Sequence, residues 1–247
     1  MGFIGVIDSG VGGLTVLQRL RQNYPYDFTY VADHAYCPYG TKPNDVVLSR
    51  ASKLVEYLKK QGAQGVVLAC NTMSVYADKL RQLYGIPIYE VITPTCKNVI
   101  ESKAKTVALL ATKSTIANGT YQAILSQYGI QVHTFDCSDF VPYVEQCSAT
   151  SIACQRVVYD ALHELPKMKV DAVVLGCTHF PLLRRQISYY CADTRIVECC
   201  CDLPNDIANV STRGNTAYYT TGNVDFANEA SSWYKGDNVA FKHILLP

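Results

Sequence analysis

The chain has 247 residues, with 22 basic and 21 acidic side chains and a formal net charge of +1 at pH 7. Only 17% of its residues are charged, so it has no electrostatic field that would attract DNA, RNA or an anionic membrane, and these partners are not indicated. Its length allows one large domain or two domains of ordinary size, each with a substantial core.

Eleven cysteines are a high and odd number for a chain that is long enough to fold without disulfide bonds. They favour reduced thiols in a cytosolic protein over a disulfide framework. The first residues enter an apolar run directly, without the basic and long apolar segments of a signal peptide, and no apolar run approaches the length of a transmembrane helix. We therefore expect a cytoplasmic protein.

The chain begins with a predicted strand, a glycine-rich loop and a helix. Residues 4–7 are apolar, residues 8–13 read Asp-Ser-Gly-Val-Gly-Gly, and Leu14, Leu17 and Leu20 then recur at helical spacing. Glycines let backbone amides approach a ligand, and the start of a helix favours a negative group. The sequence therefore indicates a ligand-binding loop near residue 10.

A second predicted strand at 28–32 ends at Asp33, about where a dinucleotide-binding fold places its ribose-binding acid. Nucleotide binding is therefore an alternative for this loop. Two features disagree with it, because Thr15 stands where the third glycine of that motif belongs, and Asp8 would repel a pyrophosphate.

The other predicted elements of the first half are a loop over 37–43, a helix over 44–61, a strand over 66–69, a helix over 74–84 and a strand over 86–91. Prolines and a glycine mark the loop, and Gly62 ends the first of these helices. Residues 92–94 look like the crossing to a second domain.

The pattern then repeats. The predicted elements are a helix near 97–102, a strand over 106–110, a helix ending near 128, a loop around 141–145, a helix over 151–165 and strands over 173–176 and 195–198. The opening strand with its loop, the Pro-Tyr loop and the strand before a cysteine recur at a near-constant offset, which indicates a duplication. After Asp202 we expect a helix, a strand over 217–221, a helix around Trp233 and a strand over 239–245.

We predict an α/β protein with two similar, open, mostly parallel-sheet domains related by a pseudo-two-fold axis. The first domain would comprise residues 1–93 and 207–247 and carry Cys70, because a C-terminal tail of under about fifty residues is too small for its own core. The second would comprise residues 94–206 and carry Cys177. Ligands bind at the carboxyl ends of the strands in open α/β sheets, so we expect the active site at the domain interface.

Cys70 and Cys177 end two closely similar stretches, VVLAC and VVLGC, and each is followed within two residues by a threonine. A single buried cysteine after a strand is usually a small core residue. Two such cysteines at the ligand ends of related strands suggest chemistry instead, because a thiol pKa of about 8.5 can be tuned toward thiol or thiolate. One thiol could take a proton from a carbon next to a carboxylate while the other returns one on the opposite face.

Other uses of cysteine fit the sequence less well. A cysteine hydrolase would need one cysteine and a distant histidine, whereas His179 is nearly adjacent to Cys177. A zinc site would need closely grouped ligands, and neither cysteine belongs to a CxxC pair. The run Cys199–Cys201 is too crowded for tetrahedral ligation, and we interpret it as local packing.

The chain resembles glutamate racemases of the cofactor-independent aspartate/glutamate racemase group, from residue 4 to the final strand. The resemblance rests on four motifs: Asp8–Gly13, Pro38–Gly40, Cys70–Thr72 and Gly176–His179. It implies interconversion of L- and D-glutamate without pyridoxal phosphate, any other cofactor or a metal. The D-glutamate would supply peptidoglycan synthesis, and hence cell wall biogenesis and cell shape. It also implies two α/β domains around a small-molecule substrate, and it leaves a homodimer open.

The resemblance also implies residue roles. Cys70 and Cys177 would be the acid/base thiols, with Cys70 deprotonating the D-enantiomer. The α-carboxylate would be held by Asn71, Thr72 and Thr178, and the side-chain carboxylate by Ser9, Tyr39 and Gly40. Asp8 and His179 would lie beside the thiols and the ammonium group and bias proton transfer. Weaker matches occur at Thr112, Thr115 and Glu145, which surface polarity would also explain.

The chain departs from the family pattern at Met73 and Ser74, where small alanines are usual, at Ala111, where glycine is common, and at Cys199–Cys201, which replaces a Ser-Gly-Asp type of turn. None of these positions is one of the paired cysteines, so we expect an active enzyme. An aspartate or other amino-acid racemase is the nearest alternative. A non-catalytic module that senses an amino acid or nucleotide is an alternative of another class, and the presence of both cysteines argues against it.

Overall fold

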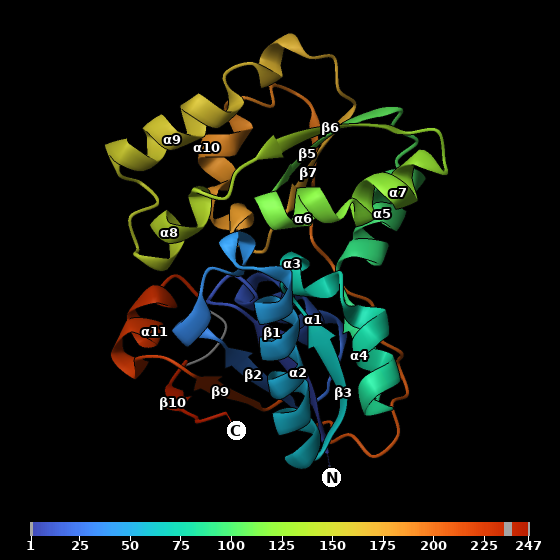
Figure 1. Cartoon of the computed structure of the whole chain (residues 1–247), viewed down its shortest axis with the longest axis vertical. Helices are drawn as coiled ribbons and strands as arrows, with labels where there is room; N and C mark the ends of the chain where they lie inside the picture. Colours follow the sequence, from blue (N-terminus) through green and yellow to red (C-terminus); the bar gives the residue numbers. More distant parts are fainter. Residues whose placement is uncertain (1, 235–238, 247) are drawn as a thin grey trace.

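The strands of the protein form two separate parallel sheets, seen in a computed structural model that describes residues 2–234 and 239–246 (Figure 1). The larger sheet has the order β10-β9-β2-β1-β3-β4, and the smaller one has the order β6-β5-β7-β8. The predicted α/β class with two mostly parallel sheets is confirmed. The predicted domain limits stay a prediction, and residues 1, 235–238 and 247, which they include, lie outside the described residues.

The six-stranded sheet consists of β1 (Phe3–Asp8), β2 (Phe28–Ala32), β3 (Ala63–Leu68), β4 (Ile88–Glu90), β9 (Thr216–Thr220) and β10 (Phe241–His243). The four-stranded sheet consists of β5 (Thr106–Ala111), β6 (Gln131–Asp136), β7 (Ala172–Gly176) and β8 (Arg195–Glu198). The orders β2-β1-β3-β4 and β6-β5-β7-β8 are the same arrangement of four successive strands. This repeated topology supports the duplication inferred from the sequence.

The α-helices are α1 (Leu14–Asn23), α2 (Asn44–Lys60), α3 (Asn71–Ser74), α4 (Ala77–Tyr84), α5 (Ile92–Glu101), α6 (Lys113–Asn118), α7 (Thr120–Ser126), α8 (Phe140–Glu145), α9 (Ile152–Leu162), α10 (Arg184–Ser188) and α11 (Val224–Ala230). Short 3₁₀ turns are η1 (His34–Tyr36), η2 (Tyr39–Thr41), η3 (Leu165–Lys167) and η4 (Phe180–Leu183). Helix α2 buries the apolar face that the sequence predicts, and the chain reverses after it at Gly62, whose φ is +96°.

The carboxyl ends of the central strands of the two sheets face one another. Strands β1, β3, β5 and β7 are almost wholly buried, as expected for apolar strands covered by helices on both faces. In Figure 1 the smaller sheet lies above the larger one, with α3 and α6 between them. Thr178 after β7 donates a hydrogen bond of 3.0 Å to Asp8 at the end of β1, which joins the two layers directly.

Two prolines lie in first helical turns, one at the expected domain crossing and one where we expected a loop. Helix α5 begins at Ile92, so Pro94 lies in its first turn, and Pro142 lies in the first turn of α8. Proline is tolerated there because the first amides of a helix have no acceptor within it. The backbone amides of Ile92 and Thr93 donate instead to the carboxylate of Glu90. The loop predicted around 141–145 is therefore wrong, and the predicted domain crossing at 92–94 lies in the first turn of α5.

The helix predicted over 74–84 is two helices, α3 and α4. The hydroxyl of Ser74 donates to the carbonyl oxygens of Leu68 and Cys70, which holds α3 against the end of β3. The amide of Tyr76 then bonds to Met73, three residues back, in a tighter turn that separates the helices. As a result, a helix begins directly after Cys70 rather than four residues later.

Strand β6 was not predicted, and a helix was predicted after Asp202 where the described residues 203–215 form none. Strand β6 is an exposed edge strand, so it lacks the apolar run of the central strands. The segment after Asp202 is irregular because tyrosine hydroxyls bind its backbone: Tyr24 accepts the amide of Leu203, and Tyr26 bonds to Pro204 and Ile207. The helix predicted around Trp233 is α11, which ends at Ala230.

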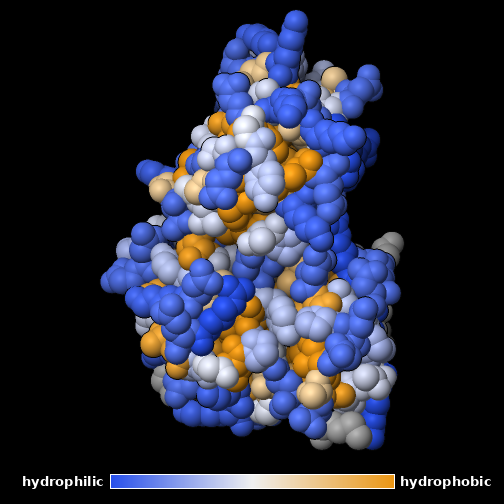
Figure 2. All heavy atoms as spheres, turned by 90° about the vertical axis from the view of Figure 1, so that its right-hand side faces the viewer, coloured by the Kyte–Doolittle hydropathy of each residue, from blue (hydrophilic) through white to orange (hydrophobic). Residues whose placement is uncertain are grey.

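The face with α4, α5 and α7 is mostly hydrophilic, and its apolar residues form separate patches (Figure 2). A groove of about 490 Å³ lies there, lined among others by Arg81 of α4, Thr93 of α5 and Thr120 of α7. Within the two described stretches, no helix is long and apolar enough to cross a membrane.

Asp33 at the end of β2 joins four segments of the first layer. Its fully buried carboxylate accepts two hydrogen bonds from Arg50 of α2, at 2.7 and 2.9 Å, and one each from Tyr39 of η2 and Thr221 after β9. Both carboxylate oxygens are therefore occupied by protein donors, which gives Asp33 a structural role.

We expect Asp33→Asn to lower the free energy of unfolding by about 2 to 3 kcal/mol, because it leaves the half-buried guanidinium of Arg50 without its countercharge. Urea unfolding followed by circular dichroism measures this change. The matched control is Asp78→Asn, which breaks an exposed pair with Arg81 and should unfold like the wild type. Equal stability of the two variants would contradict the structural role of Asp33.

Candidate active site

Asp8 lies at the meeting point of the two sheets and is fully buried. Its carboxylate accepts hydrogen bonds from the amide of Gly10, at 2.9 Å, and from the hydroxyl of Thr178, at 3.0 Å. Burial raises the pKa of Asp8 above its ordinary value, and the nearby charge of His179 opposes this rise. Asp8 is therefore a buried carboxyl at the carboxyl end of β1, where the strand order of the sheet reverses direction. Ligands bind at such places in α/β proteins.

A buried histidine–carboxylate pair stands beside Cys177. The Nε2 atom of His179 lies 2.5 Å from Oε1 of Glu145, and its Nδ1 atom lies 3.7 Å from Sγ of Cys177. Burial favours the neutral ring, but the contacts with Cys177 and Glu145 outweigh it and raise the pKa of His179 well above its ordinary value. Burial likewise opposes the charged carboxylate, but contacts with His179 and His34 outweigh it and lower the pKa of Glu145. The pair is therefore ionised at neutral pH.

Cys70 and Cys177 occupy equivalent places in the two repeated sets of four strands. Cys70 follows β3 by two residues, and Cys177 directly follows β7. They are 7% and 6% exposed, and each lies in a different hydrophobic cluster. Burial raises the pKa of Cys70, and the charges of Asp8 and Cys177 raise it further. Cys70 is therefore a neutral thiol at pH 7, close enough to Asp8 and Cys177 to respond to their charge.

Three threonine hydroxyls meet where α3 of the first layer contacts α6 of the second. Oγ1 of Thr72 lies 3.0 Å from Oγ1 of Thr112 and 3.3 Å from that of Thr115, and the last two lie 3.0 Å apart. Gly40 approaches the same cluster, because a Cβ atom there would lie 2.6 Å from the side chain of Thr112. Hydroxyls can turn their hydrogens toward an acceptor, so this cluster can bind a carboxylate.

The interpretation of Thr112, Thr115 and Glu145 as polar surface residues is wrong, because all three are buried. Thr112 caps α6 by accepting the amide of Thr115, a local pattern that the sequence carries at residues 112–115. No local pattern marks Glu145, whose partners lie far from it in the sequence.

The remaining predicted site residues lie around this centre at different places. The side chain of Asn71 is engaged at both ends, since it accepts from Tyr121 at 2.6 Å and donates to Sγ of Cys199 at 3.0 Å. The hydroxyl of Tyr39 donates to Asp33 and so is already bonded. Ser9 is buried, with its Oγ 4.0 Å from Sγ of Cys37. Of the two neighbours that the sequence did not assign to the site, Cys37 lies near Ser9 and Cys199 supports Asn71.

Glycines in the loop after β1 let the first layer touch the second. A Cβ atom at Gly10 would lie 2.6 Å from Cδ of Glu145, and one at Gly12 would lie 2.6 Å from Cε1 of His179. The amide of Val11, between them, donates to Glu145 at 2.8 Å. The loop was predicted to bring its amides to a ligand, and one of these amides is bonded to a carboxylate of the opposite layer.

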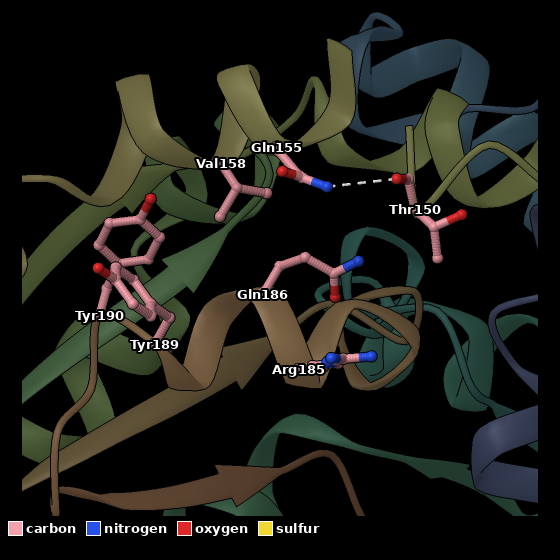
Figure 3. Close-up of a pocket in the computed structure, with 7 residues that line it drawn as sticks. All are labelled: Thr150, Gln155, Val158, Arg185, Gln186, Tyr189 and Tyr190. Carbon is pink, nitrogen blue, oxygen red and sulfur yellow. Dashed lines mark hydrogen bonds between the residues drawn. The ribbon is translucent and has the colours of Figure 1, made fainter. Parts of the chain in front are cut away.

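Two cavities among the described residues are lined by neither Cys70 nor Cys177. One of about 190 Å³ is lined by His34, Cys37 and Glu145, among others, and so adjoins the site. Another of about 430 Å³ lies between α9 and α10, where Gln155 of α9 bonds to the carbonyl of Thr150 and faces Arg185, Gln186 and the two tyrosines at 189 and 190 (Figure 3). None of the residues that line this second cavity is a predicted site residue.

Comparison with known proteins places this geometry in a family. Residues 4–200 match the family model described as Asp/Glu/Hydantoin racemase. A glutamate racemase of Aquifex aeolicus is 36% identical over 198 residues, which are 79% of this chain and 78% of the relative. One of Streptococcus pyogenes serotype M2 is 32% identical over 98% of both chains. The crystal structure of glutamate racemase isoform RacE1 from Bacillus anthracis superposes with a TM-score of 0.88 at 27% identity, covering 100% of this chain and 98% of that one.

The ionised pair predicts the effect of Glu145→Gln on His179. The variant removes an anion but leaves the ring buried, so the pKa of His179 should fall by one unit or more, about tenfold in the protonation constant. The raised pKa of His179 stabilises the fold at pH values below it, and the lowered pKa of Glu145 stabilises the fold at pH values above its own. The loss of unfolding free energy should therefore be largest near neutral pH and shrink in acid and in strong base.

An NMR titration of the His179 ring, with urea unfolding at several pH values, measures both effects. Glu164→Gln, which removes an exposed carboxylate beside His163, is the matched control and should leave the His179 titration unchanged. An unaltered His179 titration in Glu145→Gln would contradict the ionised pair.

Proposed function

The chain belongs to the Asp/Glu/Hydantoin racemase family and is an isomerase, and from this premise we propose that it interconverts L- and D-glutamate through two cysteine thiols. The observation that supports the scheme most directly is the symmetry of the thiols. Cys70 and Cys177 follow β3 and β7, the matching strands of two sheets whose carboxyl ends face each other. Two acid/base groups of one kind on opposite sides of a carbon centre are what reversible inversion requires.

The surroundings make the two thiols unequal, which prepares the direction of the reaction that starts from L-glutamate. Cys70 is a buried thiol that holds its proton. Cys177 lies 3.7 Å from Nδ1 of His179, whose ring is protonated at neutral pH. A Cys177 thiolate takes the α-proton of L-glutamate, and the Cys70 thiol then gives its proton to the opposite face of the planar carbanion, which yields D-glutamate. The same steps in reverse start with Cys70 as the base for D-glutamate.

The polar side chains supply places for the two carboxylates of glutamate. The α-carboxylate would bind to Asn71, Thr72 and Thr178, with the hydroxyls of Thr112 and Thr115 next to Thr72. The side-chain carboxylate would bind near Ser9, Tyr39 and Gly40, where backbone amides complement the hydroxyl of Ser9, since the hydroxyl of Tyr39 is bonded to Asp33. Asp8 and His179 would flank the ammonium group and the thiols.

Glutamate is favoured over aspartate because the relatives that align with nearly the whole chain are named glutamate racemases. The D-glutamate formed would supply peptidoglycan synthesis. We expect circular dichroism to show racemisation of either glutamate enantiomer with no added cofactor, and at least about tenfold slower conversion of aspartate, a difference of about 1.4 kcal/mol in transition-state binding. Equal rates on both substrates would overturn the preference for glutamate.

Cys70→Ser and Cys177→Ser should each lower the rate of racemisation by about a thousandfold, because a hydroxyl is a far weaker acid/base group than a thiol at neutral pH. In heavy water the wild type should incorporate deuterium at Cα of the product, which NMR detects. Cys147→Ser, which changes an exposed cysteine outside the site, is the control and should match the wild type. Full turnover by either site variant would refute the two-thiol scheme, and binding of glutamate without any exchange would indicate a sensing module.

A further inference from the structure

Three side chains with metal-binding atoms meet at the edge of the site, and a fourth, His34, contacts one of them. Sγ of Cys37, a carboxylate oxygen of Glu145 and a ring nitrogen of His179 all lie within 4.8 Å of one another. Nε2 of His34 lies 3.2 Å from Oε2 of Glu145. His34 and Cys37 belong to the segment after β2 of the first layer, whereas Glu145 ends α8 and His179 follows β7 in the second layer. The cluster therefore spans both layers.

Two atoms of this cluster are buried and make no hydrogen bond. They are Nε2 of His34 and Oε2 of Glu145, whose 3.2 Å contact lacks hydrogen-bond geometry. The His34 side chain is 2% exposed, and its other nitrogen, Nδ1, lies 2.8 Å from the hydroxyl of Thr220, which fixes the ring. A histidine held in this way by one nitrogen presents the other as a ligand, as metal-binding histidines do. Two buried polar atoms that face each other without a well-aligned hydrogen bond need an explanation.

We propose that His34, Cys37, Glu145 and His179 form an inhibitory site for Zn²⁺ or another divalent cation of the same ligand preference. Two imidazole nitrogens, one thiolate and one carboxylate are the ligand types that zinc takes in tetrahedral sites. The charges balance, because the two positive charges of the ion meet one thiolate and one carboxylate. A metal site whose ion and ligands have no net charge avoids the cost of burying a net charge.

Three of the four donors lie near the spacing of a tetrahedral site, and His34 contacts one of them. Metal–ligand bonds of about 2.0 to 2.3 Å place neighbouring donor atoms roughly 3.3 to 3.8 Å apart. The His34–Glu145 contact of 3.2 Å is near this range, and the donor atoms of Cys37, Glu145 and His179, within 4.8 Å of one another, need movements of about 1 Å. His34 is not within that distance of all three, so its ring must also move toward Cys37 and His179. A cavity of about 190 Å³ reaches the cluster past Pro38, Pro142 and Phe226, which provides a path for the ion.

Binding of the ion releases protons. Burial and the charges of Glu145 and Asp8 raise the pKa of the Cys37 thiol well above its ordinary value, so the metal must displace the Sγ proton. It must also displace the Nε2 proton of His179, which leaves for the solvent. Apparent affinity therefore increases with pH over the range in which these protons are bound.

The bound ion would inhibit the enzyme in two ways. It would take Glu145 and His179 as ligands, which removes the positive ring from Cys177. It would also tie the segment after β2 to α8 and to the end of β7, which holds the two layers closed over thiols that are only 6% and 7% exposed. The inhibition rests on the proposed function, whereas the binding of the ion does not.

Cobalt(II) is the probe for binding, because a thiolate–cobalt bond absorbs in the near ultraviolet and a tetrahedral ion gives intense visible bands. We expect one Co²⁺ per chain with both signatures, displaced by Zn²⁺. Cys37→Ser should abolish the thiolate band, and His34→Gln should weaken binding by tenfold or more. The controls Cys147→Ser and His163→Gln change an exposed cysteine and an exposed histidine outside the cluster and should bind as the wild type does. An undiminished thiolate band in Cys37→Ser would overturn the site.

Zinc inhibition is then measured as the ratio of racemisation rates with Zn²⁺ and with excess chelator, within each variant. His34→Gln should need at least tenfold more Zn²⁺ for half inhibition than the wild type or His163→Gln. Equal inhibition of all three proteins would refute the inhibitory role. Cobalt signatures without any racemisation of glutamate would refute the proposed function and still support the metal site.

Discussion

The contact between the carboxyl ends of the two sheets is the constraint on which the rest of the structure depends. It consists of buried polar links rather than apolar packing alone: Thr178 to Asp8, and Val11 to Glu145. A buried polar group without a partner costs about 1 to 3 kcal/mol, so each link is favourable only while the layers stay in register. The same links fix the places of the thiols, because Cys70 and Cys177 follow β3 and β7, and these strands pair directly with β1 and β5.

This contact explains the composition of the loop after β1. Gly10 and Gly12 adopt no left-handed backbone conformation, so conformational freedom is not why glycine is needed there. Their lack of a Cβ atom lets Glu145 and His179 approach the backbone. The same holds for Gly40 against Thr112. In each case the glycine lies in the first layer and its close neighbour in the second, so the motif is shaped by the opposite half of the chain.

Local patterns predicted the elements well, and contacts between distant segments were predicted poorly. The strand at 28–32, the helix after Pro43 and the cysteines at matching strand ends could be identified from periodicity and spacing. Strand β6 was missed because an exposed edge strand has no apolar run. The start of α5 at Pro94 and the helix α8 at Pro142 were missed because proline is compatible with a loop and with a first helical turn. Glu145 could not be assigned, because its partners Val11, His34 and His179 lie 134, 111 and 34 residues away, and only the fold brings them together.

The buried charges also explain why the site is closed and how it can still take an anion. Glu145 and His179 form a neutral pair, and burial raises the pKa of Asp8, which limits the negative charge beside the thiols. The hydroxyls of Thr72, Thr112 and Thr115 bond to one another across the two layers. A carboxylate that binds there exchanges these mutual bonds between neutral groups for charge-assisted bonds, which are about twice as strong. The same three hydroxyls therefore hold the two layers together and can bind the anion. A bound carboxylate replaces the hydrogen bonds between the hydroxyls with its own hydrogen bonds to them.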